Sequence, residues 1–157
     1  MHISHHVSPI RQPNINDCWA TATAMVLRLN GISGVTDIKR RAASVRLNHN
    51  GSIPSTSVNS LATALGLNFR NLANPPLSLS PGILARALRH SCAAAFGQYN
   101  YPGAPNATNH VLLFYSIQGR DENPMVYFID PYTGRRYNYL VDEINQSLGS
   151  VDYMLYS

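Results

Sequence analysis

Three side chains in this sequence are of the types that cooperate in nucleophilic catalysis: Cys18, His110 and Asp130. A cysteine thiolate attacks a carbonyl carbon, an imidazole moves the proton, and a carboxylate fixes the tautomer and the direction of the imidazole. Each residue type is common in structural positions, so none of the three is informative alone. Their positions are informative, because each stands at the expected end of a helix or a strand.

Cys18 stands where a helix is expected to begin. The run from Cys18 to Asn30 has a helical pattern, and Gly31 after it is a typical helix stop, while Asn16 or Asp17 can cap the first amides. At a helix N-terminus the unpaired N–H groups and the positive end of the dipole favour a thiolate. We therefore expect Cys18 to be the nucleophile.

The second cysteine, Cys92, lies in an apolar stretch and is expected to be a core residue. A bridge between Cys18 and Cys92 is formally possible, but two cysteines do not make a disulfide framework. Neither a CxxC motif nor a Cys/His zinc spacing occurs. We therefore expect no metal and no cofactor.

His110 and Asp130 stand at the ends of two predicted strands. An apolar run at 111 to 115 follows His110, and Asp130 follows a second run at 125 to 129. If the connection between them folds the strands into an antiparallel pair, the start of the first strand faces the end of the second. Their order in the chain therefore predicts that His110 and Asp130 are neighbours.

Three further residues complete the candidate site. Gln12, six residues before Cys18, carries an amide NH₂ that can donate to an oxyanion together with the backbone N–H of Cys18. Trp19 and Asn109 adjoin the nucleophile and the base, and we expect them to contact the substrate.

The elements that must position these residues divide the chain into two halves. Residues 1–10 read as an irregular leader, and helices are expected at 36 to 47, at 57 to 65 and after a Ser80-Pro81 cap. Beyond residue 91 the pattern changes to short strands at 93–99, 110–118, 125–130, 136–140 and 152–156. The sequence predicts an α+β fold, in which a helical N-terminal half packs on a C-terminal antiparallel sheet.

Length and composition limit the classes of protein to consider. A chain of 157 residues with 45% hydrophobic content fits one domain, 1–157, with its own core. The net charge of +4 comes from scattered arginines without an interleaved aromatic patch, so no nucleic-acid partner is expected. No apolar run is long enough to span a membrane or to serve as a secretory signal, so we expect a soluble protein.

The spacing of these motifs resembles the papain-like cysteine proteases, in particular the compact bacterial branch with bacteriocin-processing peptidase domains and secreted effectors. Relative to the plant and lysosomal pattern, the histidine follows the cysteine after only 92 residues, and an aspartate stands in place of asparagine. The matching segments are Gln12-x5-Cys18-Trp19, Asn109-His110-Val111-Leu112 and Ile129-Asp130-Pro131-Tyr132-Thr133-Gly134.

The resemblance implies a papain-like cysteine protease with Cys18 as nucleophile, His110 as general base and acid, Asp130 as its orienter and Gln12 in the oxyanion hole. Its bacteriocin-processing members further imply cleavage of protein substrates after a Gly-Gly pair. An amidase or deamidase of side-chain or cell-wall amides, and a catalytically silent binding module, remain as alternatives. We expect a bacterial effector or toxin domain, exported by a dedicated secretion system into a target cell and held in check by an inhibitory immunity protein.

Overall fold

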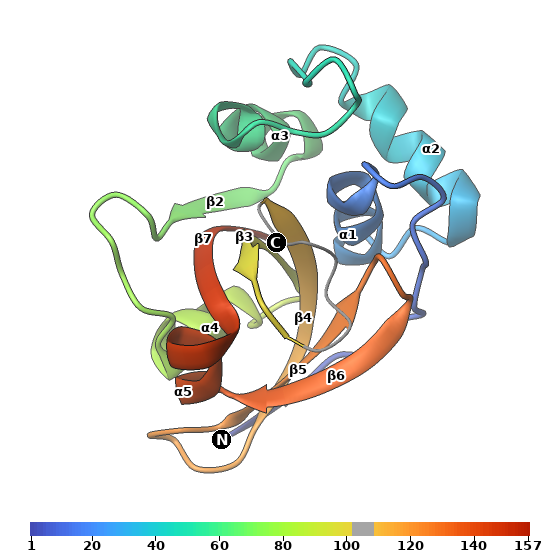
Figure 1. Cartoon of the computed structure of the whole chain (residues 1–157). Coiled ribbons are helices and arrows are strands. Elements are labelled where there is room, and N and C mark those ends of the chain that lie inside the picture. The colour runs from blue at the N-terminus through green and yellow to red at the C-terminus, as the bar shows by residue number, and fades with distance from the viewer. Residues whose placement is uncertain (102–108) are drawn as a thin grey trace.

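The computed structural model describes residues 1–101 and 109–157. Within them, one seven-stranded sheet with the order β2-β7-β3-β4-β5-β6 forms the centre of the molecule, and β1 pairs with β4 (Figure 1). All pairs of neighbouring strands are antiparallel. The strands are β1 (His2–Ser4), β2 (Asn68–Asn71), β3 (Ala93–Tyr99), β4 (His110–Gln118), β5 (Met125–Asp130), β6 (Arg135–Leu140) and β7 (Gly149–Tyr156).

Helices cover both faces of this sheet. In Figure 1, α1, α2 and α3 gather on one side, and α4 and α5 lie on the other. The helical elements are α1 (Cys18–Val26), α2 (Gly31–Arg41), η1 (Ser55–Ser57), α3 (Val58–Leu65), α4 (Pro81–Ala87), α5 (Val141–Glu143) and η2 (Ile144–Leu148). The predicted α+β architecture, with a helical first half packed on an antiparallel sheet, is confirmed.

The alternation of side chains along the strands creates two hydrophobic clusters. Along β4, Val111 and Leu113 join the cluster that contains α1, α2 and α3, whereas Leu112 and Phe114 join the cluster beneath α4. Successive side chains of a strand point to opposite faces, so one apolar run supplies both clusters. This double burial fixes β4, and with it the position of His110 at its start.

Helix α1 lies in the interior of the helical half. Its small residues let it approach the sheet closely, and every side chain from Trp19 to Val26 is buried. Only Cys18 at its first position is partly exposed. A buried helix therefore carries the candidate nucleophile at its one accessible end.

Two helix predictions were wrong in their bounds. The first helix ends at Val26 rather than Asn30, because Arg28 takes a left-handed conformation with φ +58° that breaks the helix. Gly31 then begins α2 instead of stopping α1, and α2 ends at Arg41, well before residue 47. Helix α3 at Val58–Leu65, its stop at Gly66, and the Ser80 cap of α4 agree with the prediction.

The five predicted strands are present, and two further strands were missed. His2–Ser4 forms β1 at the edge of β4, so the interpretation of residues 1–10 as an irregular leader was wrong for these three residues. Asn68–Asn71 forms β2 against β7. Both segments are short, and each offers a single apolar side chain, Ile3 or Phe69, to the core, so neither has the apolar run by which the other strands were predicted.

Candidate active site

Cys18 is the first residue of α1, as predicted, but the predicted cap is not formed. Asp17 occupies the N-cap position without a side-chain cap hydrogen bond. Its carboxylate instead lies 2.7 Å from Nζ of Lys39 and accepts a hydrogen bond of 2.9 Å from Nδ2 of Asn14. The start of α1 is thereby tied to α2 and to the preceding loop, which holds Cys18 in place.

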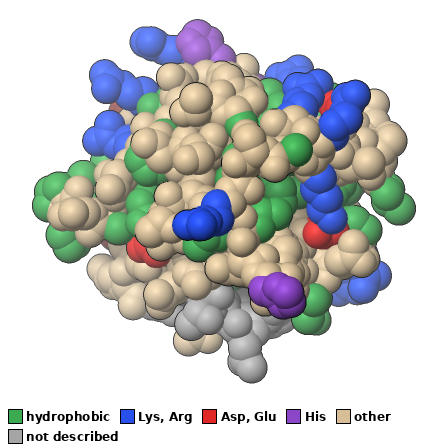
Figure 2. Space-filling view, turned by 90° about the horizontal axis from the view of Figure 1, so that it is seen from above, with side chains coloured by type: hydrophobic (Ala, Val, Ile, Leu, Met, Phe, Trp, Pro, Cys, Tyr) green, Lys and Arg blue, Asp and Glu red, His purple; other side chains and the backbone are tan. Residues whose placement is uncertain are grey.

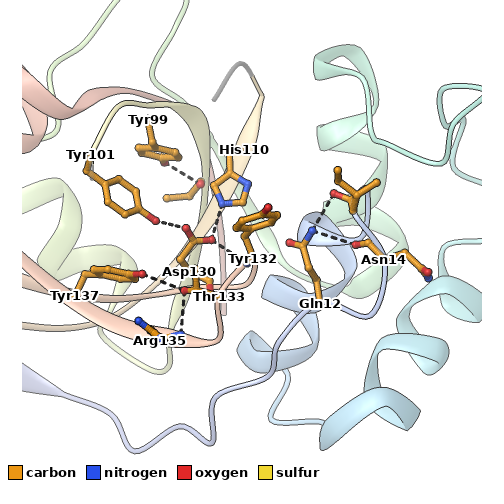
Figure 3. Close-up of polar contacts among 12 residues, drawn as sticks. Gln12, Asn14, Tyr99, Tyr101, His110, Asp130, Tyr132, Thr133, Arg135 and Tyr137 are labelled. Atoms are coloured by element: carbon orange, nitrogen blue, oxygen red, sulfur yellow. Dashed lines mark hydrogen bonds and ion pairs between the residues drawn. The ribbon is translucent and has the colours of Figure 1, made fainter. Parts of the chain in front are cut away.

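His110 and Asp130 meet as their places on neighbouring strands predicted. His110 begins β4 and Asp130 ends β5, and Nε2 of His110 lies 2.6 Å from Oδ1 of Asp130 (Figure 3). Cys18 lies close enough to the same imidazole to contribute to the pKa of His110, and Nδ1 is the ring nitrogen that does not contact Asp130. The structure therefore pairs His110 with Asp130 and places Cys18 near the same ring.

The surroundings of His110 favour its protonated form. Burial of the ring lowers the pKa of His110, but the hydrogen bonds to Asp130 and Cys18 and the charges of both outweigh it and raise the pKa to about 9. At neutral pH the imidazole is therefore cationic. Its bond to Asp130 is then a charge-assisted one.

Asp130 is fully buried, and its carboxylate is well satisfied. Oδ1 accepts a hydrogen bond of 2.9 Å from the backbone N–H of Tyr132 as well as the contact with His110. Oδ2 accepts a hydrogen bond from the hydroxyl of Tyr101. In Figure 3 these contacts converge on the carboxylate from separate segments of the chain. A buried charge is tolerated only with such partners, so this carboxylate is held in one orientation.

Tyr101 is the residue of this cluster that sequence reasoning missed. Its ring packs edge-on to Phe128 and against Tyr137, and its side chain is 5% exposed. Burial and the hydrogen bond to Asp130 raise the pKa of Tyr101 far above its usual range, so its hydroxyl remains a donor. The sequence carries no signal for this contact, because Tyr101 lies outside the predicted strands.

Gln12 lies beside this cluster, but its amide is already used. In Figure 3 its Nε2 donates to the carbonyl oxygens of Asn14, at 3.0 Å, and Ile15, at 2.8 Å. An amide nitrogen carries two hydrogens, so both are committed within the loop that leads to Cys18. The predicted donation to an oxyanion thus requires one of these bonds to be released. Meanwhile, Oε1 of Gln12 is buried without a hydrogen-bond partner among the described residues.

A family model described as papain-like cysteine protease AvrRpt2 matches residues 2–149. The chain belongs to this family. It is therefore a cysteine peptidase, and hence a hydrolase, as the sequence motifs indicated. No curated protein sequence matches the chain significantly.

In this papain-like protease, the two residues expected to contact substrate differ in placement. Trp19 is only 1% exposed, and its Nε1 donates to the carbonyl of Gly51 at 3.0 Å, so its ring faces the interior, and its contact with substrate stays a prediction. One helical position turns a side chain by about 100°, which directs Trp19 inward when Cys18 faces out. Asn109 is exposed in a left-handed conformation with φ +62°, directly before His110. Its contact with substrate stays a prediction.

The second cysteine of the protease is separated from the site. Cys92 is buried in the core, as predicted, and burial raises the pKa of its thiol to about 11. Both cysteines are free, so the bridge between Cys18 and Cys92 is not formed.

Two cavities lie beside the candidate catalytic residues. A cavity of about 250 Å³ adjoins His110 and Asn109, and one of about 430 Å³ lies beside Gln12 and Tyr132. Figure 2 shows basic side chains dispersed over the face above the helices, with uncharged residues between them. Across residues 1–101 and 109–157 there is no cluster of three or more metal-ligating side chains, and no helix long and apolar enough to cross a membrane.

Proposed function

We propose that this protease hydrolyses peptide bonds in protein substrates with Cys18 as nucleophile, His110 as general acid and base, and Asp130 as the group that orients His110. The observation that carries this proposal is the buried His110–Asp130 pair near Cys18, the first residue of α1. A cationic imidazole beside a cysteine at a helix N-terminus stabilises the thiolate that attacks the substrate.

In the proposed reaction, the sulfur of Cys18 bonds to the carbonyl carbon and the carbonyl oxygen becomes negative. The backbone N–H of Cys18 has no partner within the helix and stabilises that charge, with Gln12 as the second donor once one of its loop bonds is released. His110 then gives its proton to the leaving nitrogen as the C–N bond breaks. Water, deprotonated by His110, attacks the thioester and releases the acid with the regenerated thiol.

The alternatives make different products from the same groups. A deamidase or a cell-wall amidase would break a side-chain or peptidoglycan amide and leave protein chains intact. A silent binding module has no need for a nucleophile, base and orienter in contact. The protease family and the assembled contacts favour peptide-bond hydrolysis.

Two narrower predictions go beyond the family. One is cleavage after a Gly-Gly pair. The other is a role as a bacterial effector or toxin, secreted into a target cell and neutralised in the producing cell by an immunity protein. Co-purification of a small protein that blocks alkylation of Cys18 would support the second prediction, and harmless expression of the active chain alone in its own host would contradict it.

The experiment that tests the proposal measures the rate of iodoacetamide labelling at both cysteines from about pH 4 to 9, by peptide mass spectrometry. We expect Cys18 to label rapidly near about pH 5, because His110 is cationic there and stabilises the thiolate. The change His110→Ala should remove that reactivity, while Cys92 serves as the protected internal control. Labelling of Cys18 that is independent of His110 would contradict the proposed nucleophile.

Product analysis separates the alternatives. Protein mixtures treated with the full chain should gain new N-termini, and Cys18→Ala should produce none. A gain of about 1 Da per glutamine without chain breaks would identify a deamidase instead.

A further inference from the structure

The cavity beside His110 is built from both halves of the protein. It holds about 250 Å³ and is bordered by Val58 of α3, by Phe96 of β3, by Asp152 and Tyr153 of β7, and by Asn109 and His110. That volume is at the small end of ligand pockets and suits one large side chain rather than a whole cofactor. Because His110 forms part of its wall, a side chain in this cavity belongs to a substrate whose reacting bond is close by.

A β-bulge places Asp152 at this cavity. Phe96 pairs with Tyr153, but the next residue, Gly97, pairs with Val151, so Asp152 is an extra residue on β7. Such a bulge interrupts the alternation of side chains and redirects the extra residue. Asp152 and Tyr153 therefore both border the cavity, although consecutive residues of a regular strand point to opposite faces.

The bulge is fixed by a close approach of the two strands. A Cβ atom at Gly97 would lie 1.9 Å from the carbonyl oxygen of Ser150, so only glycine fits there. Gly149, farther along β7, has φ +134° and meets the backbone of Gln98 in the same way. The position of Asp152 is therefore set by the backbone and not by its own contacts.

Asp152 brings a negative charge that no basic side chain in the described part of the chain neutralises. Among the residues lining the cavity it is the only carboxylate, and across the described residues it takes part in no ion pair. Its carboxylate accepts a single hydrogen bond of 3.2 Å from the hydroxyl of Ser150. The cation in the wall, His110, is already paired with Asp130.

We propose that Asp152 makes this cavity a subsite for a basic side chain, arginine or lysine, of the protein substrate. The aliphatic stem would lie along Val58, Phe96 and Tyr153, and the cationic end would pair with Asp152, as long basic side chains commonly arrange themselves. This inference rests on the proposed function, since it names a specificity of the same site. It also differs from cleavage after Gly-Gly, because glycine has no side chain to occupy the cavity.

The first test uses synthetic peptide libraries in which one position near the scissile bond is either arginine or citrulline, which has the same shape without the charge. We expect the full chain to cleave the arginine library about tenfold faster in kcat/KM at one position, and Asp152→Asn to abolish that preference. Asp121→Asn removes an exposed carboxylate from the β4–β5 connection and is the matched control. Equal cleavage of both libraries by the unaltered chain would overturn the proposal.

A second measurement is independent of catalysis. N-acetylarginine methylamide and its citrulline analogue are titrated into the Cys18→Ala chain while NMR follows the amide signals of Asn109 and Tyr153. The arginine compound should shift these signals more than the citrulline compound, and Asp152→Asn should remove the difference. Equal shifts would refute the subsite even in an active protease. If the arginine compound shifts the signals selectively but the unaltered chain cleaves no protein, the subsite is supported and the proposed function is refuted.

Discussion

The two sides of the candidate active site are built in different ways. On one side, His110 and Asp130 sit on adjacent strands, and Asp130 is fully buried with donors from His110, Tyr101 and the backbone of Tyr132. On the other side, Gln12 lies in a loop, where its Nε2 donates to two carbonyls and its buried Oε1 has no partner in residues 1–101 and 109–157. A hydrogen bond of 2.7 Å from the Gln12 N–H to the carbonyl of Pro131 joins the two sides.

The difference shows which catalytic groups are already in their working arrangement before substrate binds. The antiparallel pairing of β4 and β5 holds the base and its orienter side by side. A buried oxygen without a partner costs about 1–3 kcal/mol, so the Gln12 side is the less stable arrangement. We infer that substrate binding rearranges the Gln12 side and leaves the His110 side unchanged.

The largest effect in this comparison is expected for Gln12→Ala. If Gln12 becomes an oxyanion donor once substrate binds, its loss should lower kcat by about 10²- to 10³-fold with little change in KM. The measurement is steady-state kinetics on a peptide substrate, with the unaltered rate of Cys18 alkylation as proof that the nucleophile is intact. A change confined to KM would mean that Gln12 only braces the loop.

A smaller effect is expected for Asp130→Asn. The side chain keeps its shape but loses the charge that raises the pKa of His110, and burial then lowers this pKa from about 9. The imidazolium required for catalysis is lost as pH rises through the pKa of His110, so the alkaline limb of kcat/KM should move to lower pH. The maximum rate should fall by about 10- to 10²-fold, less than for His110→Ala. If the alkaline limb of the kcat/KM profile stays at the same pH, a group other than His110 controls that limb.

The smallest change in rate is expected for Tyr101→Phe, and it comes with a pH shift of distinctive direction. The ring and its packing remain, but Asp130 loses one hydrogen-bond donor and directs more of its charge to His110. The alkaline limb should therefore move to higher pH, opposite to Asp130→Asn, while the maximum rate changes by less than about tenfold. Tyr137→Phe, in the same aromatic cluster, is the control. A merely structural tyrosine would lower stability without moving the limb.

The strand pattern predicted more of the site than the helix pattern did. Alternation and turn residues were sufficient to place His110 and Asp130 at facing strand ends, because register follows from topology. The hydrogen bonds of Gln12 and the missing side-chain cap at Asp17 could not be predicted. Each depends on which of several neighbouring groups the side chain binds in the folded protein. The role of Tyr101 and the inward position of Trp19 were missed because their partners lie far away in sequence, at Asp130 and Gly51.

Trp19 gives the protein an optical signal next to the candidate nucleophile. It is the only tryptophan in the chain, it follows Cys18 directly, and its indole N–H is bonded to the loop at Gly51. The wavelength of indole fluorescence depends on the polarity around the ring. Any movement of that loop which admits water to the indole of Trp19 will therefore shift the emission to the red, without a label and in real time.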